Sequence, residues 1–120
     1  MQGLADFTFK RNSSWVMNTH ILLFIRVWRE VFYRVFRKRR IVRFTSGNDG
    51  AHSQDPISKH YFNLAGDTGA RSIQNTRATF MVSLAQKKFD TYAGKGKWFV
   101  QHSSSPAHFH SQISKRRILL

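Results

Sequence analysis

The sequence predicts a small α+β or mainly α protein built around one long, basic, amphipathic helix near its N-terminus. Apolar side chains recur at helical spacing between residues 15 and 44. Turn-forming residues then gather between residues 46 and 56 and separate this segment from the rest. A chain of 120 residues is expected to form one domain. We therefore expect the helix, a turn-rich linker, a second shorter helix, one or two short strands and a flexible C-terminal tail.

Residues 1–14 are predicted to form a flexible lead-in, with Ser13 or Ser14 as the N-cap of the long helix over residues 15–44. Glu30 precedes Arg34 by four positions, which is the favourable order for a helical ion pair. The alternating residues 41–45 leave open a strand at the end of this segment. The apolar stripe of the helix consists of Ile21, Phe24, Ile25, Trp28, Val31, Phe32, Val35 and Phe36.

Residues 45–101 are predicted to form a small, marginally stable α/β module. The second helix is expected over residues 70–89, with Gly94 as its stop signal. A strand is the rival reading of residues 78–84, and short strands are expected at residues 61–64 and 97–101. Residues 66–69 have the composition of a turn. The segment from 102 to 120 is rich in Ser and His and is predicted to be a disordered basic tail.

The charge balance indicates an anionic partner. Lysine and arginine number 20 against six acids, which gives a formal net charge of +14. Residues 26–44 hold eight bases and one acid, so half of that charge lies in this short segment. Such an excess favours nucleic acid or an acidic membrane surface as partner. The absence of cysteine excludes disulfides, thiolate metal sites and cysteine nucleophiles.

We expect nucleic acid, RNA more than DNA, to be bound through its phosphates. Guanidinium groups grip phosphate with two hydrogen bonds, and the contact depends strongly on salt. The expected contacts are Arg34, Arg37, Lys38, Arg39, Arg40 and Arg43, with Lys87, Lys88, Lys95, Lys97, Lys115, Arg116 and Arg117 as secondary contacts.

The alternative is a membrane-surface protein that inserts the helix over residues 15–36 into an acidic bilayer. A basic face opposite a face of Trp, Phe and Leu is typical of interfacial helices. The rival interpretation is that the same stripe packs on residues 57–100. The side chains that would enter the bilayer are Ile21, Phe24, Ile25, Trp28, Phe32 and Phe36.

Asp67-Thr68-Gly69-Ala70 resembles the active-site signature of retropepsin-type aspartic proteases. In that family two such aspartates, one per subunit, share a proton and activate water. The sequence departs from the family before the aspartate, where Ala65 and Gly66 replace bulky apolar residues. A Ser/His-rich tail also stands where the family has a strand-and-helix module. We therefore expect no protease and no other enzyme.

The histidines do not predict a metal site. His108 and His110 lie on one side of an extended chain, and His102 could join them. Zinc needs three or four ligands held in fixed geometry, which a tail does not supply. We expect neither a metal nor a cofactor.

The sequence thus predicts a small, non-enzymatic accessory protein or ribonucleoprotein component. Basic clusters serve as nuclear or nucleolar addresses, and an Arg-rich, acid-poor N-terminus is typical of mitochondrial presequences. These compartments are favoured over secretion. A viral-type accessory product of an overlapping or recently arisen reading frame is a further alternative.

Overall fold

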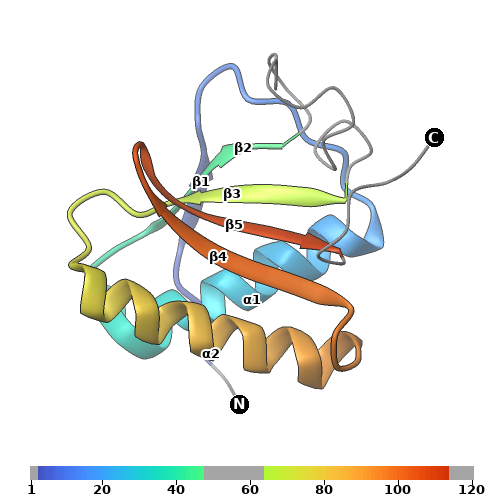
Figure 1. The fold of residues 1–120 in the computed structure, drawn as a ribbon. Coiled ribbons are helices and arrows are strands. Elements are labelled where there is room, and N and C mark those ends of the chain that lie inside the picture. Colours follow the sequence, from blue (N-terminus) through green and yellow to red (C-terminus); the bar gives the residue numbers. More distant parts are fainter. Residues whose placement is uncertain (1–2, 48–63, 114–120) are drawn as a thin grey trace.

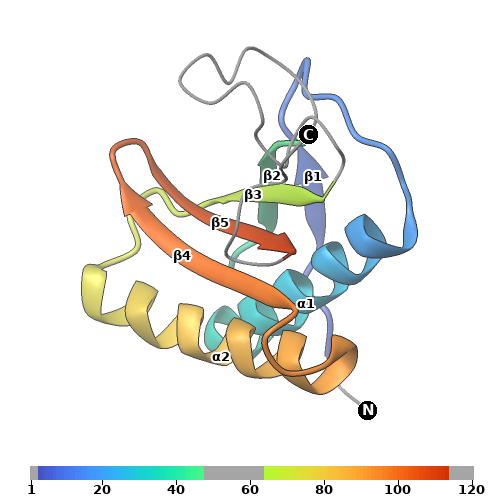
Figure 2. The ribbon, with the colours of Figure 1, turned by 45° about the vertical axis from the view of Figure 1, so that its right-hand side comes forward.

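Two helices cover one face of a five-stranded mixed sheet in the computed structural model, which describes residues 3–47 and 64–113 (Figure 1). The elements in chain order are β1 (Phe7–Phe9), α1 (Thr19–Phe36), β2 (Val42–Ser46), β3 (Ala65–Gly69), α2 (Asn75–Ala93), β4 (Trp98–Ser104) and β5 (Ala107–Ile113). The strand order is β1-β2-β3-β5-β4, with β1 and β2 parallel and the other neighbours antiparallel. The rotated view in Figure 2 again places both helices on the same side of the sheet.

The predicted fold class is wrong in its balance of elements. The sheet has five strands instead of one or two, and no long N-terminal helix dominates the fold. The helix predicted over residues 15–44 is shorter at both ends. It begins after Asn18, whose side-chain oxygen accepts a hydrogen bond from the Ile21 amide at 2.8 Å, and not after Ser13 or Ser14. It ends at Phe36, because Arg37 adopts a φ of 56°.

The segments that flank α1 pair with each other as parallel strands. Val42 and Phe44 are fully buried, whereas Arg43 between them is exposed. That alternation is typical of a strand with one buried face. Phe7 and Phe9 of the predicted lead-in stand opposite Val42 and Phe44 in the register. The lead-in is therefore in part the edge strand β1.

The second helix forms, but it is not shorter than the first, since α2 has 19 residues and α1 has 18. It ends at Gly94, as the sequence predicts, with a φ of 109° that glycine tolerates. The predicted turn over residues 66–69 is instead part of β3. The strand expected at residues 61–64 falls largely outside the described residues.

The C-terminal tail predicted from residue 102 is wrong up to residue 113, because β4 and β5 form a hairpin there. Phe109 and Ser111 are fully buried, while His108, His110 and Gln112 alternate with them on the other face. Burial alternates from residue to residue as in a strand, but one of the two buried side chains, Ser111, is polar. The Ser- and His-rich sequence therefore lacks the apolar alternation by which a strand is usually predicted.

The core lies between the sheet and the two helices. Trp28 of α1 stacks on Phe109 of β5 at a centroid distance of 4.6 Å and donates its ring N–H to the Ser111 hydroxyl at 2.8 Å. A Cβ added at Gly66 would lie 2.6 Å from the Phe24 ring, so α1 approaches β3 where a glycine leaves space. On the α2 side, Phe89 stacks on Trp98 at 4.4 Å.

Candidate nucleic-acid interface

The basic block begins where α1 ends. The Arg37 amide donates to the Tyr33 carbonyl at 2.8 Å, and its guanidinium lies 5.5 Å from the centre of the Tyr33 ring. Arg39 Nε donates to the Phe36 carbonyl at 3.2 Å. Cationic side chains satisfy the last carbonyls of a helix and favour its negative end. Arg37, Lys38 and Arg39 are nevertheless all exposed, so they remain accessible to a ligand.

Arg77, from a distant part of the chain, meets this block on the ring of Phe36. The guanidinium carbons of Arg40 and Arg77 lie 5.4 Å and 5.6 Å from the centre of that ring. Arg40 also donates from Nη2 to the backbone carbonyl of Arg71 at 2.6 Å. Burial lowers the pKa of Arg40, but an arginine remains charged at neutral pH. We call Arg37, Lys38, Arg39, Arg40, Arg71 and Arg77 the arginine cluster.

The N-terminus of α2 adds to the positive character of this region. Its N-cap residue, Gln74, makes no side-chain capping hydrogen bond, and its first turn holds no acid. Helix N-termini carry a partial positive charge because their first amide groups lack intrahelical partners. Arg71 and Arg77 flank this end of α2. The local field thus has the same sign as the side chains.

The carboxylates of the described residues do not neutralise the arginine cluster. Glu30 pairs with Arg26 and Lys88, and Asp67 pairs with His110. Asp90 accepts a hydrogen bond from Gln86. Within residues 3–47 and 64–113, no acid lies within ion-pair distance of a member of the cluster. The described acids therefore leave the charge of the cluster uncompensated.

Glu30 joins the two helices and does not form the predicted pair with Arg34. Its side chain is 1% exposed and accepts hydrogen bonds from Arg26 Nε at 2.9 Å, Lys88 Nζ at 3.0 Å and the Tyr92 hydroxyl at 2.6 Å. Burial raises the pKa of the carboxyl, but these three donors outweigh burial and leave the pKa below its ordinary value. Lys88 is therefore half-buried and engaged, and it is a poor candidate for a phosphate contact.

The other predicted contacts are scattered. Arg34 is exposed on α1, and Arg43 lies on the sheet face opposite the helices. Lys87 is exposed and lines a shallow cavity of about 340 Å³ on α2 together with Leu84, Lys88, Thr91 and Tyr92. Lys95 and Lys97 flank the turn between α2 and β4, at the opposite end of α2 from the cluster. The predicted contacts Lys115, Arg116 and Arg117 lie outside the described residues.

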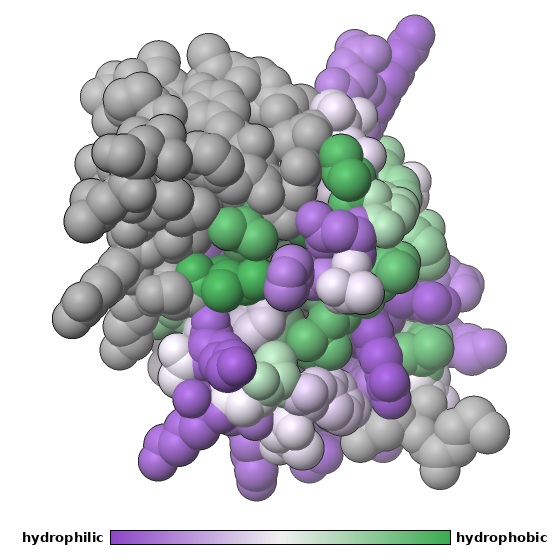
Figure 3. All heavy atoms as spheres, turned by 90° about the vertical axis from the view of Figure 1, so that its right-hand side faces the viewer, coloured by the Kyte–Doolittle hydropathy of each residue, from purple (hydrophilic) through white to green (hydrophobic). Residues whose placement is uncertain are grey.

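The stripe assigned to a bilayer in the alternative hypothesis is in the core. Ile21, Phe24, Ile25, Trp28 and Phe32 are at most 8% exposed, and Phe36 is half-buried. In this fold these side chains cannot reach a bilayer without separating α1 from the sheet. Over the residues described, neither helix is long and apolar enough to span a membrane. Figure 3 shows apolar side chains interspersed with hydrophilic ones on one face of the molecule.

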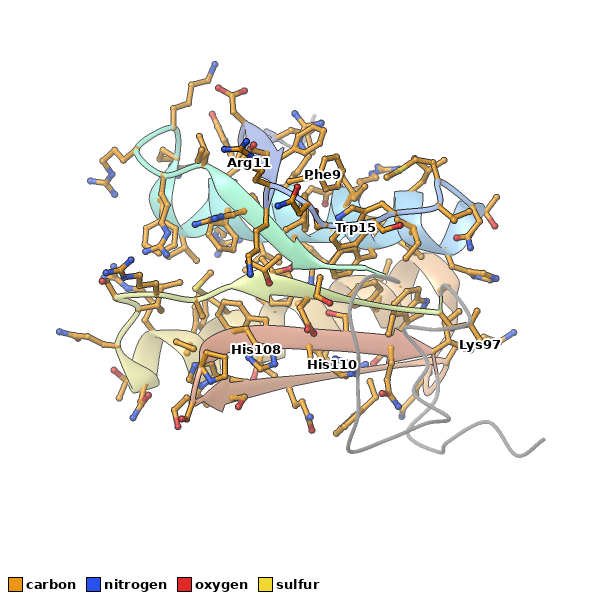
Figure 4. All side chains as sticks on the ribbon, turned by 90° about the horizontal axis from the view of Figure 1, so that it is seen from above. Phe9, Arg11, Trp15, Lys97, His108 and His110 are labelled. Atoms are coloured by element: carbon orange, nitrogen blue, oxygen red, sulfur yellow. The ribbon has the colours of Figure 1, made fainter. Side chains whose placement is uncertain are left out.

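The histidines and the Asp-Thr-Gly segment meet on the sheet. Asp67 lies inside β3, and its carboxylate contacts His110 Nδ1 at 2.9 Å, while His110 Nε2 contacts Gln112 Oε1 at 2.8 Å. Burial lowers the pKa of His110, but Asp67 and Gln112 raise it overall. In Figure 4, His108 and His110 lie along β5, and the burial pattern of the strand places them on the sheet face away from the helices. No cluster of three metal-binding side chains occurs in the described parts of the chain.

Sequence reasoning missed Arg71 and Arg77 as members of the site. Both lie in a region of balanced charge, so no local excess distinguishes them. The signal that could have found them is the start of a helix at residue 75, which places Arg71 and Arg77 at its positive end.

No protein-family model matches the chain, and no curated protein or solved structure shows significant similarity to it.

Proposed function

We propose that this protein is a non-enzymatic nucleic-acid-binding protein, acting on RNA as an accessory or ribonucleoprotein component, which contacts phosphates through the arginine cluster. One observation carries the proposal. Arg40 and Arg77, which are far apart in the sequence, converge on the ring of Phe36, and no acid of the described residues lies within ion-pair distance of the arginine cluster.

The chemistry of the cluster suits a phosphate backbone. Arginine presents a planar fork of donors that matches phosphate oxygens, and several such groups side by side bind a chain of phosphates better than one ion. The ring of Phe36 holds Arg40 and Arg77 by cation–π contacts, each worth about 0.5–2 kcal/mol. These two guanidinium groups are therefore partly ordered before a ligand binds.

The proposal is tested by comparing two double variants in binding to a labelled single-stranded RNA, with fluorescence anisotropy as the readout. Arg40→Gln with Arg77→Gln removes the two groups on Phe36. Lys95→Gln with Lys97→Gln removes the same charge at the other end of α2. We expect the arginine variant to lose at least about tenfold in affinity, and the lysine variant to lose about threefold or less. Equal losses would show that binding follows net charge and not the cluster.

Acidic lipid is the competing ligand for the same charges. Flotation of nuclease-treated protein with vesicles that contain anionic lipid distinguishes lipid binding from nucleic-acid binding. Under the nucleic-acid proposal, the Kd for RNA lies well below the lipid concentration needed for flotation at physiological salt. Flotation that persists in Arg40→Gln with Arg77→Gln, without measurable RNA binding by the unmodified protein, would refute the proposal.

A further inference from the structure

The first half of the outer edge of β4 is covered by a side chain of α2. The Gln86 amide donates from Nε2 to the Trp98 carbonyl at 2.7 Å and accepts at Oε1 from the Val100 amide at 3.1 Å. A neighbouring strand would make the same two kinds of bond. Asp90 accepts a second hydrogen bond from the Gln86 amide at 3.0 Å and holds it in place. These bonds show that the backbone groups of Trp98 and Val100 point away from β5.

The hydrogen bonds of β5 fix the orientation of the remaining edge groups. The Ile113 amide donates to the Leu64 carbonyl at 3.0 Å, and the Ala70 amide donates to the Ala107 carbonyl at 3.1 Å. The backbone N–H and C=O groups of the odd-numbered residues of β5 therefore point toward β3, and those of its even-numbered residues point toward β4. Bonding between antiparallel strands alternates in this way from residue to residue.

The second half of the β4 edge is consequently open. In the register, Gln101 stands opposite His110 and Ser103 opposite His108, so these residues bond inward to β5. The outward groups are the Val100 carbonyl, both backbone groups of His102 and the Ser104 amide. Among residues 3–47 and 64–113, no other group forms a hydrogen bond with them.

This open edge lacks the features that usually prevent edge pairing. Natural edge strands carry lysine, proline or a bulge. Residues 98–113 contain no Lys, Arg, Asp or Glu, and β4 pairs with β5 over seven residues without a break in register. The stripe of α2 that includes Gln86, and so faces the edge, also holds no base, since it consists of Asn75, Thr79, Val82, Gln86 and Asp90.

We propose that the open edge of β4 pairs antiparallel with the same edge of a second copy of this chain, around a two-fold axis at His102. The backbone N–H and C=O of His102 then bond to those of His102 in the second copy. The Ser104 amide donates to the Val100 carbonyl across the axis. The pattern is self-complementary, as a two-fold interface requires, and it ends where Gln86 occupies the edge.

Charge favours a second copy over another basic or acidic partner at this edge. The protein carries +14, so copies repel each other over most of their surface. Near His102 both copies present a hairpin without Lys, Arg, Asp or Glu, where this repulsion is least. Under the two-fold axis, Gln101 lies opposite Ser103 of the second copy, on the sheet face away from the helices. These two positions are therefore suited to a test by charge.

The test measures association by sedimentation velocity on nucleic-acid-free full chain from about 1 to 500 μM. The unmodified protein is expected to pass from monomer to dimer and no further. Gln101→Lys with Ser103→Lys places like charges opposite each other, whereas Gln101→Glu with Ser103→Lys places opposite charges there. Cross-strand pairs of this kind differ enough to raise the dimer Kd about tenfold in the first variant and leave it equal or lower in the second.

A cooperative thermal unfolding transition is required of each variant, as the control that it folds. Arg40→Gln with Arg77→Gln is expected to dimerise like the unmodified protein, because the arginine cluster is not part of the edge. Monomer throughout the concentration range would overturn the inference, as would assemblies that grow beyond the dimer. Equal Kd values for the two variants at positions 101 and 103 would also overturn it, since the proposed register then does not form.

Discussion

At the scale of single residues, the buried carboxylate of Glu30 ties α1 to α2 through Lys88 and Tyr92. Glu30→Gln keeps the shape but leaves Lys88 without its counter-ion, so we expect it to lower the free energy of unfolding by about 2 kcal/mol at pH 7. Arg26→Gln is the control, because that partner is 60% exposed and its loss should have a much smaller effect. Urea denaturation of both variants measures the difference.

The contribution of Glu30 should depend on pH. Its pKa is lower in the folded protein than its ordinary value of 4.5, so the unfolded chain binds the proton more readily. The stabilisation is therefore complete above about pH 5 and is lost as the pH falls through the folded pKa. Unmodified protein and Glu30→Gln should converge in stability in acid. A gap in unfolding free energy that stays constant down to pH 3 would contradict this assignment.

At the scale of elements, the Ser/His-rich segment is a structural strand that contributes to the core. Ser111 accepts the ring N–H of Trp28 at 2.8 Å, and both side chains are fully buried. Ser111→Ala would leave that N–H without a partner, and we expect a loss of about 1–3 kcal/mol in unfolding free energy. Ser104→Ala, on an exposed serine, should change it by less than about 0.5 kcal/mol. Equal effects in thermal or urea unfolding would show that β5 is not docked.

The elements differ in how far the sequence alone reveals them. The stripe of Phe24, Trp28 and Phe32 identifies α1, and all three side chains are buried as the amphipathic pattern predicts. Its ends are less visible, because Arg37 leaves the helix through a backbone angle that composition does not encode. β5 cannot be predicted from apolar alternation, because its buried positions include the polar Ser111. The hydroxyl of Ser111 is satisfied in the core by a hydrogen bond from Trp28, which is distant in sequence.

The candidate site also has residues that local sequence reveals and residues that only tertiary contacts reveal. Arg37, Lys38, Arg39 and Arg40 are recognisable from local charge density. Arg77 lies near them because the tertiary fold places the start of α2 beside Phe36 at the end of α1. Lys88 is removed from the set of available bases by the buried Glu30, another contact between residues far apart in sequence. Local charge therefore identifies four members of the arginine cluster but not Arg71 or Arg77.

At the scale of the whole molecule, the excess of positive charge and its placement make the binding of an anionic polymer the central expectation. The described acids are mostly engaged in internal contacts, and the arginine cluster gathers six bases at one end of the helical layer. Binding of this kind releases counterions, so log affinity falls linearly with log salt, with a slope of about 0.7 per phosphate contact on a single strand.

The measurement that tests this account most directly is the salt dependence of RNA affinity for the unmodified protein and for the variant in which Arg37, Lys38, Arg39 and Arg40 are replaced by glutamine. Anisotropy titrations between about 50 and 300 mM salt supply both slopes. We expect a steep slope for the unmodified protein and a slope smaller by about two to three in the variant. An unchanged slope in a variant that remains folded would contradict phosphate binding by the arginine cluster.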